Sequence, residues 1–427
     1  TRCGGLSRGL GDVYKRQEYL WGDVDRISPE APVQVVSIKN EGYALGGAGN
    51  VVNNAVALGA KVSVAGVIGS GRNGQLLRDK FNELGVDIEG IFEEPARLTT
   101  QKTRIIASHQ QVLRIDRETD TGISDATLEK ITRFIEDKIP QVDVVLISDY
   151  GKGLITQKLL SRMTASAQKH QKMSIVDPKG LDFSKYSGAS LLTPNKKEAA
   201  MASNVEVVDE STLEKSANNI FETVGLDKLL ITCGKEGMVL FDKNREPFRV
   251  RAEARQVYDV SGAGDTVLAV LGLAIASGAS IHNAVSVANT AAGIVVGKVG
   301  TATVSKEELA SALKSGDPGR PAKFKNLSEL PALIEELKKK GKQLVLTNGC
   351  FDLLHAGHIR LFSESKQMGD ILIVAIDDDA SVKNLKGSGR PVIRAEERVR
   401  ILSALDSVDY VVVFSSHELE MLIVIVQ

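Results

Sequence analysis

Apolar residues along the chain fall into short continuous runs, separated by longer stretches in which apolar positions recur every three or four residues. Short runs of this kind are typical of strands buried on both faces, and the longer stretches are typical of amphipathic helices. This pattern predicts strands at 32–38, 61–69, 142–150, 173–177, 190–195, 228–234, 343–349, 370–376 and 409–414. It predicts helices at 44–60, 75–85, 155–170, 196–203, 265–278, 282–298 and 326–341.

Strands and helices alternate along most of the chain, which favours parallel sheets covered on both faces. The segment KSGDPGRPAKF, residues 314–324, concentrates Gly, Pro and charge and is the predicted linker between two domains, 1–313 and 325–427. Residues 1–17 show neither strand alternation nor a helical stripe, and we expect them not to belong to the first domain's native sequence. The tail 421–426, MLIVIV, is expected to add a strand to the second sheet or to be a sticky exposed segment.

The charge, cysteine content and apolar runs of the chain limit the kinds of partner it is expected to bind. The chain has 427 residues, 53 basic and 54 acidic, with a formal net charge of -1, so it lacks the basic excess that nucleic-acid binding uses. Three widely spaced cysteines suggest no disulfide framework and fit a reducing cytoplasm. No apolar run is long enough for a membrane span, so we expect no membrane partner. The expected partners are small-molecule substrates.

The segment DVSGAGDTVLAVLGLAIASG, residues 259–278, is where the sequence is most informative. Gly262, Ala263 and Gly264 precede an apolar helix, whose first amides and positive dipole end favour an anion such as phosphate. Asp265 would lie beside that phosphate and could accept a proton from an attacking hydroxyl. Alternatively, Asp265 is only a helix cap and the glycines only a turn.

Three more motifs accompany GAGD. They are GGAGN at 46–50, NKKE at 195–198, suited to positioning Mg²⁺ through water, and TCGKEG at 232–237, a glycine turn that could pass under nucleotide phosphates. Taken singly, NKKE is an ordinary charged helix start and TCGKEG an ordinary hairpin turn. Another glycine motif, GSGRNG at 69–74, matches the dinucleotide fingerprint, but we find no clean strand ending in Asp or Glu at the expected distance after it.

In this order the four motifs resemble those of the ribokinase-like (PfkB) sugar kinases. The resemblance implies a three-layer α/β domain that uses ATP and Mg²⁺, with Asp265 as catalytic base and Gly262, Ala263 and Gly264 as anion hole. It also implies the following binding residues: Gly46, Gly47, Asn50, Asp149 and Lys152 for sugar, Asn195 and Glu198 for Mg²⁺ and nucleotide, and Thr232 and Gly234 for nucleotide. The family's opening strand ends in Gly-Asp, which Gly11 and Asp12 match. Lys15, Arg16 and Gln17 stand where the family has a second sugar-binding aspartate.

The second domain carries a motif of its own, TNGCFDLLHAGHIRLF, residues 347–362. His355 and His358 lie three residues apart at a helix start, so both imidazoles face one side and could stabilise charge as pyrophosphate leaves. A metal site formed by Cys350, His355 and His358 is the alternative, although no fourth ligand is evident.

HAGH resembles the HxGH signature of the cytidylyltransferase-like nucleotidyltransferases, which implies a Rossmann-like domain, and residues 386–402 resemble that family's basic loop. His355 and His358 would then be catalytic, and the implied nucleotide-binding residues are Thr347, Phe351, Lys386, Arg390 and Arg398. That family also has a later Ser/Thr-rich motif, which we do not find after Phe414. We therefore expect a C-terminally truncated transferase domain, with adenylyl transfer weaker than phosphotransfer.

The fusion of these two domains resembles the bifunctional enzymes that act on heptose phosphates. The resemblance implies phosphorylation of heptose 7-phosphate at its anomeric hydroxyl, adenylyl transfer to heptose 1-phosphate for lipopolysaccharide synthesis, and a homodimer formed through the kinase domain. Two alternatives remain open: a different sugar kinase fused to a cytidylyltransferase, and a catalytically idle sugar-nucleotide sensor.

Overall fold

The chain divides into two compact units, Thr1–Gly319 and Arg320–Gln427. The structure, a computed structural model, describes residues 6–11, 15–107, 110–119, 121–243, 245–252, 259–298, 300–315, 321 and 323–426. The predicted linker at 314–324 falls largely outside these residues and stays a prediction.

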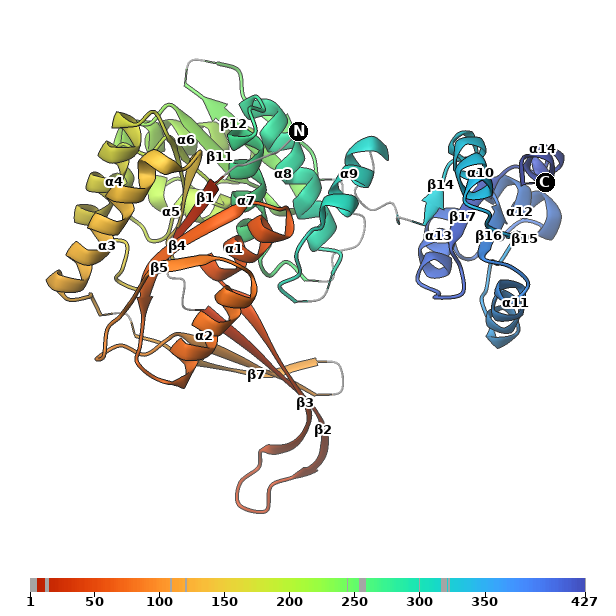
Figure 1. The fold of residues 1–427 in the computed structure, drawn as a ribbon, viewed down its shortest axis with the longest axis horizontal. Coiled ribbons are helices and arrows are strands. Elements are labelled where there is room, and N and C mark those ends of the chain that lie inside the picture. Colours follow the sequence, from red (N-terminus) through yellow and green to blue (C-terminus); the bar gives the residue numbers. More distant parts are fainter. Residues whose placement is uncertain are drawn as a thin grey trace. The chain divides into compact units, whose positions relative to one another are not determined.

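A nine-stranded sheet forms the centre of the first unit, in the order β13-β12-β11-β10-β9-β8-β1-β4-β5 (Figure 1). Neighbouring strands run parallel from β11 to β5, and β12 and β13 add an antiparallel edge. The strands are β1 (Leu6–Gly11), β4 (Lys61–Ile68), β5 (Asp87–Glu93), β8 (Val144–Ser148), β9 (Met173–Asp177), β10 (Leu191–Leu192), β11 (Lys228–Thr232), β12 (Met238–Asp242) and β13 (Phe248–Val250).

Both faces of this sheet are covered by helices, as the continuous apolar runs predicted. Val145 and Ile147 of β8 pack with α3, α4 and α6, whereas Val144 and Leu146 pack with α7 and α8. The α-helices of the unit are α1 (Ala48–Ala57), α2 (Arg72–Glu83), α3 (Asp125–Lys138), α4 (Gln157–Lys169), α5 (Lys196–Ser203), α6 (Glu210–Val224), α7 (Ala263–Ala276), α8 (Ile281–Val295) and α9 (Lys306–Ser315). Single 3-10 turns are η1 (Ile139–Gln141), η2 (Ser184–Tyr186) and η3 (Gly234–Glu236).

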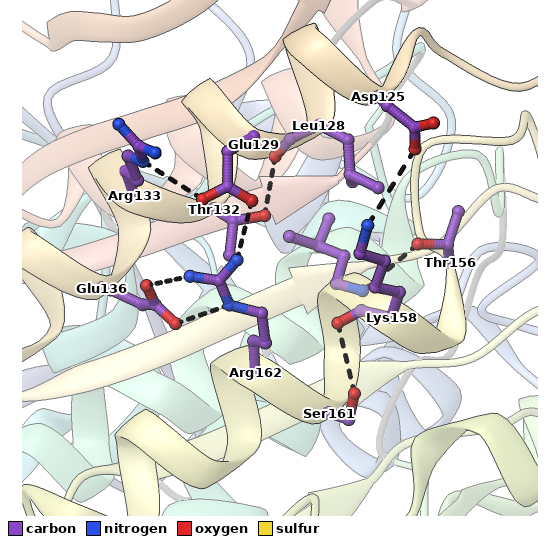
Figure 2. A network of polar contacts seen from close by, with 11 residues as sticks. Asp125, Leu128, Glu129, Thr132, Arg133, Glu136, Thr156, Lys158, Ser161 and Arg162 are labelled. Atoms are coloured by element: carbon purple, nitrogen blue, oxygen red, sulfur yellow. Dashed lines mark hydrogen bonds and ion pairs between the residues drawn. The ribbon is translucent and has the colours of Figure 1, made fainter.

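Charged side chains join the outer helices α3 and α4 (Figure 2). Arg162 of α4 donates to both oxygens of Glu136, at 2.9 and 2.6 Å, and to Glu129 at 2.9 Å. The two-pronged contact with Glu136 uses the planar fork of the guanidinium, which a lysine could not reproduce. This network fixes how α4 lies on α3 and contains none of the residues predicted to do chemistry.

A second sheet of four strands projects from the first unit, in the order β3-β2-β6-β7 (Figure 1). Its strands are β2 (Lys15–Ile27), β3 (Gln34–Gly46), β6 (Gln101–Ala107) and β7 (Gln110–Arg117), and we call this sheet the lid. The sequence predicted only residues 32–38 of it. It also predicted no strand in residues 1–17, which was wrong: Leu6–Gly11 forms β1 between β8 and β4, and Lys15 begins β2.

The second unit is a three-layer α/β unit with a parallel sheet in the order β14-β17-β16-β15. Its strands are β14 (Phe324–Lys325), β15 (Leu344–Gly349), β16 (Ile371–Asp377) and β17 (Tyr410–Phe414). Its helices are η4 (Leu327–Glu329), α10 (Leu330–Lys339), α11 (Ala356–Lys366), α12 (Asp379–Lys386), α13 (Ala395–Ser403) and α14 (Leu419–Val426). α11 and α13 pack on one face of the sheet, and α10 and α14 pack on the other.

The apolar tail is a helix, so the expectation of a strand there was wrong. Leu422 of α14 is fully buried against Leu330 and Ile334 of α10, whereas Val424 stays exposed. No helix among the described residues is long and apolar enough to cross a membrane.

The first and last glycines of the motif at 69–74, Gly69 and Gly74, serve packing. A Cβ on Gly69 would lie 2.1 Å from the carbonyl oxygen of Arg97, and one on Gly74 would lie 2.3 Å from that of Gly69. β5 does end in Glu93, so the sequence argument against a dinucleotide site was wrong in that detail. These close backbone contacts explain the glycines without a ligand.

Candidate functional sites

The loop before α7 delivers Asp265 to the first turn of that helix. Gly262 precedes the helix with a left-handed φ of 83°, a conformation that favours glycine. The carboxylate of Asp259 accepts hydrogen bonds from the amides of Ser261 at 2.8 Å and Gly300 at 3.2 Å, which fixes the start of the loop. Asp265 itself is buried, with 6% of its surface exposed.

Two side chains hold the Asp265 carboxylate from opposite sides. The Tyr150 hydroxyl donates to Oδ1 at 2.6 Å, and the Asn50 amide donates to Oδ2 at 2.9 Å. Burial, followed by the negative charge of Asp265, raises the pKa of Tyr150 well above its usual value, so the phenol remains a donor. Asp265 is therefore a fixed, buried carboxylate, which is more than a helix cap requires.

The three amides predicted to form the anion hole differ in their partners. No acceptor among the described residues binds the amides of Gly262 and Gly264, whereas the amide of Ala263 donates to the carbonyl of Val260 at 3.3 Å. The prediction for Ala263 therefore needs correction, because that amide is already engaged. Gly262 and Gly264 offer the amides at this helix start.

The predicted sugar residues lie around this carboxylate, with differing roles. Gly46 ends β3, and Gly47 caps α1 with a φ of 62°. The fully buried side chain of Asn50 is directed at Asp265, so in this structure it positions that carboxylate. Its predicted contact with sugar, like those of the two glycines, stays a prediction.

Asp149 and Lys152 are both engaged with other protein groups. The Asp149 carboxylate accepts from Lys185 at 2.6 Å, from the Tyr186 hydroxyl at 2.7 Å and from the amide of Gly151 at 2.7 Å. Lys152 donates to Glu118 at 2.6 Å. Because Asp149 is buried and its oxygens are occupied, it anchors the loop that carries Tyr150.

The NKKE motif forms a capping box at the start of α5. The Asn195 side chain accepts from the amide of Glu198 at 2.9 Å, and the Glu198 carboxylate accepts from the amide of Asn195 at 3.0 Å. Glu198 also pairs with Lys179 at 2.7 Å. A parallel bridge joins Asn195 to Thr232, which brings the NKKE motif beside the TCGKEG turn. Gly234 begins that turn with a φ of 59°.

Negative charge accumulates near the base. Burial raises the pKa of Asp177 well above its usual value, and the charges of Glu198 and Asp265 raise it further. Such a site favours a divalent cation that keeps part of its water shell. Tyr150 and Asp177 were not predicted as site residues, although each is the last residue of a predicted strand, where the catalytic edge of a parallel sheet lies.

The second unit has a hollow of about 760 Å³ at the carboxyl end of β15. Predicted residues lining it are Phe351, His355, His358, Lys386 and Arg390, and the hollow is also lined by Asn348, Gly349, Cys350, Asp352, Leu353 and Leu361. Thr347, in β15, and Arg398 do not line it.

The two histidines stack with their ring centroids 4.0 Å apart. His355 caps α11, and its Nδ1 accepts from the amide of Gly357 at 3.1 Å, which leaves Nε2 free to donate when the ring is neutral. Burial lowers the pKa of His358, and the nearby positive charges of His355 and Lys386 lower it further. Phe351 contacts the His358 ring edge-on, with centroids 5.3 Å apart.

Asp352 and Arg398 hold the basic loop in place. The buried Asp352 carboxylate accepts from Arg390 at 2.7 Å and from the amides of Val392 and Ile393 at 2.7 and 3.0 Å. The Arg398 guanidinium is fully enclosed: it donates to Asp379 at 2.7 Å and to the carbonyls of Ile393, Cys350 and Asp377. The prediction that Arg398 contacts phosphate is corrected, because its donors brace the loop.

The alternative metal site finds no support in the described part of the chain, where no group of three or more His, Cys, Asp or Glu is placed to hold an ion. Cys350 is buried, and burial raises the pKa of its thiol. A protonated thiol is a poor metal ligand.

Comparison with known proteins connects both sites to characterised families. Residues 18–308 match the pfkB family of carbohydrate kinases, and residues 346–425 match the cytidylyltransferase-like family. The "Bifunctional protein HldE" of Desulfatibacillum aliphaticivorans is 56% identical over 406 residues, which cover 95% of this chain and 83% of that protein. The protein of the same name from Geobacter metallireducens is 49% identical over 405 residues, covering 95% and 82%.

Solved structures resemble the first unit. A ribokinase of Arabidopsis thaliana complexed with ribose and ATP has a TM-score of 0.59 at 18% identity, covering 73% of this chain and 99% of that one. The phosphofructokinase-2 of Escherichia coli in complex with potassium has a TM-score of 0.60 at 18% identity, with the same coverage. These similarities establish the ribokinase-like fold of the first unit.

Proposed function

The chain belongs to the pfkB carbohydrate kinases and to the bifunctional HldE proteins, and from this premise we propose the reaction at each of its two sites. The protein is a bifunctional transferase with a carbohydrate kinase domain and a nucleotidyltransferase domain. The first unit phosphorylates heptose 7-phosphate at its anomeric hydroxyl with ATP. The second transfers AMP from ATP to heptose 1-phosphate, giving ADP-heptose and pyrophosphate for the lipopolysaccharide core.

The kinase reaction rests on one observation, the buried Asp265 carboxylate held between Tyr150 and Asn50 at the start of α7. Asp265 accepts the proton of the anomeric hydroxyl as that oxygen attacks the γ-phosphorus of ATP. The amides of Gly262 and Gly264 donate to the phosphoryl oxygens as the bond to ADP breaks. Tyr150 and Asn50 keep the base in one orientation throughout.

Mg²⁺ accompanies ATP in the first site. Glu198 and Asn195, whose side chains lie together in the capping box, would hold the ion through water. When bound, the ion neutralises charge on the ATP phosphates. Thr232 and Gly234 then contact the nucleotide from the neighbouring turn. The bridge between Asn195 and Thr232 places this turn beside the NKKE motif.

Adenylyl transfer takes place in the hollow of the second unit. An oxygen of the sugar 1-phosphate attacks the α-phosphorus of ATP, and the bond to pyrophosphate breaks. His355 and His358 donate to the α-phosphate, while Lys386 and Arg390 balance the charge of the leaving pyrophosphate. Asp352 orients Arg390 for this role.

We also propose a homodimer formed through the kinase domain, with the lid as contact surface. The face of the lid that carries Tyr43, Leu113 and Ile115 exposes 52%, 52% and 41% of these side chains. An apolar face of this kind favours association. Light scattering coupled to size-exclusion chromatography measures the mass directly. A cytoplasmic location is proposed as well, in keeping with the free thiols of Cys233 and Cys350.

Two assays test the proposed reactions on the whole chain. ADP release is measured with ATP, Mg²⁺ and heptose 7-phosphate, and pyrophosphate release with ATP and heptose 1-phosphate. CTP with glycerol 3-phosphate is the matched alternative for the second unit. A preference for CTP would favour a cytidylyltransferase, and ligand-induced stabilisation without either product would favour a sensor.

A further inference from the structure

One face of the lid covers the kinase site. The parallel pairing of β2 with β6 sets Tyr19 opposite Arg104, so both side chains lie on the same face. The Arg104 guanidinium lies 5.6 Å from the centre of the Tyr19 ring and donates to Gln17 at 2.8 Å. The Tyr19 hydroxyl donates to the same oxygen of Gln17 at 2.8 Å, which makes these three side chains one connected group.

This group lies directly against residues of the kinase site. A Cβ on Gly46 would be 2.8 Å from the Gln17 side chain, and one on Gly300 would be 3.6 Å from the Tyr19 hydroxyl. Thr301 also lies close to Tyr19. Thr301 in turn lies beside the anion-binding turn, because a Cβ on Gly262 would be 3.3 Å from its methyl group.

The charge balance distinguishes Arg104 from neighbouring cations. Lys152 pairs with Glu118, Lys102 with Glu118 and Asp116, and Arg114 with Asp116. Among the described residues, no carboxylate lies within ion-pair distance of the Arg104 guanidinium. A partly buried guanidinium with only a neutral amide partner has donors to spare for an anion.

We propose that Arg104, positioned by Gln17 and Tyr19, binds the phosphate of the sugar substrate that does not react. This inference rests on the proposed kinase function. With the anomeric hydroxyl at Asp265, the 7-phosphate of the heptose lies at the other end of the sugar, under the lid. The fork of a guanidinium suits a phosphate, and it selects a phosphorylated sugar over the free sugar.

The test compares two substrates, heptose 7-phosphate and the same heptose without phosphate, in wild type, R104Q and R104K. We expect R104Q to lower kcat/KM for heptose 7-phosphate by roughly 100-fold, because one partner of a charge pair is lost. The value for unphosphorylated heptose stays within about twofold, since that sugar has no group for Arg104 to bind. R104K restores part of the loss, because it keeps the charge without the fork.

The matched control is R114Q on the adjacent strand β7. It removes the same charge from the lid, but Arg114 is exposed and paired with Asp116 at 3.1 Å, so both substrates keep their wild-type kinetics. Equal losses for both substrates in R104Q would overturn the inference and leave Arg104 a structural part of the lid. The inference would also be overturned if R104Q kept full activity and the wild-type ratio of kcat/KM between the two substrates. If wild type fails to phosphorylate heptose 7-phosphate, the proposed function fails instead.

Discussion

Replacing Tyr150 with phenylalanine removes the hydroxyl that donates a hydrogen bond to the catalytic carboxylate. The bond to Asp265 Oδ1 is short, at 2.6 Å, and is partly buried. Hydrogen bonds to charged groups contribute about 1.5–3 kcal/mol, which corresponds to roughly 10- to 100-fold in rate if the bond is needed in the transition state. We expect Y150F to lower the kinase kcat within this range and to leave the KM for ATP unchanged.

The pH profile separates positioning from general damage. A carboxylate that loses a donor binds its proton more tightly, so the acidic limb of the kcat profile moves to higher pH in Y150F. The pKa of Tyr150 itself is raised well above its usual value by burial and by Asp265, so the phenol does not contribute a limb of its own near neutral pH.

The control is Tyr186→Phe, which removes an equivalent bond to a neighbouring carboxylate. Tyr186 donates to Asp149 at 2.7 Å and is fully buried. Because Asp149 anchors a loop and accepts no substrate proton, Y186F should lower the unfolding temperature without moving the acidic limb. The reasoning would be refuted by a Y150F profile and kcat equal to those of wild type, or by the same shift in Y186F.

Two further predictions concern the loops that carry each site. Gly262→Ala places a Cβ 2.6 Å from the Asn50 amide at a φ of 83°, so it should reduce the kinase kcat by about 10-fold or more. The control is Gly278→Ala, which has a similar φ of 86° but open space around it and should lower only the stability. Equal losses of kinase activity in the two variants would contradict this account. For Asp352, burial would raise the carboxyl pKa, but the bonds from Ile393, Arg390 and Val392 outweigh it and lower the pKa. A carboxyl group whose pKa is lowered by folding stabilises the protein above the unfolded pKa of about 3.9, and this stabilisation is lost as pH falls through the folded pKa. D352N should therefore be less stable than wild type near pH 7, and the two proteins should become equally stable in acid. Calorimetry from neutral to acidic pH measures this, and a constant difference between the two proteins would contradict it.

Much of the architecture could be predicted because buried parallel strands and amphipathic helices leave strong patterns. The helix at 196–203 has the predicted bounds, since Asn195 and Glu198 form its capping box. Most of the lid was missed because Glu18, Arg104 and Arg114 interrupt the apolar positions of its strands, so no continuous apolar run stands out.

Other features depend on contacts between distant parts of the sequence. The apolar tail is a helix whose Leu422 is buried against α10, a contact that the local pattern of the tail does not reveal. Arg398 resembled a phosphate ligand in sequence, yet its partners Cys350 and Asp377 come from other elements and enclose it. Likewise, Tyr150 is 115 positions from Asp265, so their contact follows from the order of strands in the sheet.

The central claim is that one chain holds two separate catalytic sites, with Asp265 as the base of the kinase and the HAGH histidines serving the transferase. The direct test measures both half-reactions in wild type, Asp265→Asn and His358→Ala. We predict that the kinase rate of D265N is roughly 10²- to 10⁴-fold lower than that of wild type, as expected for loss of a general base, and that D265N retains adenylyl transfer. H358A should lose adenylyl transfer and retain the kinase. Loss of both activities in either variant, or near wild-type phosphorylation by D265N, would contradict the account.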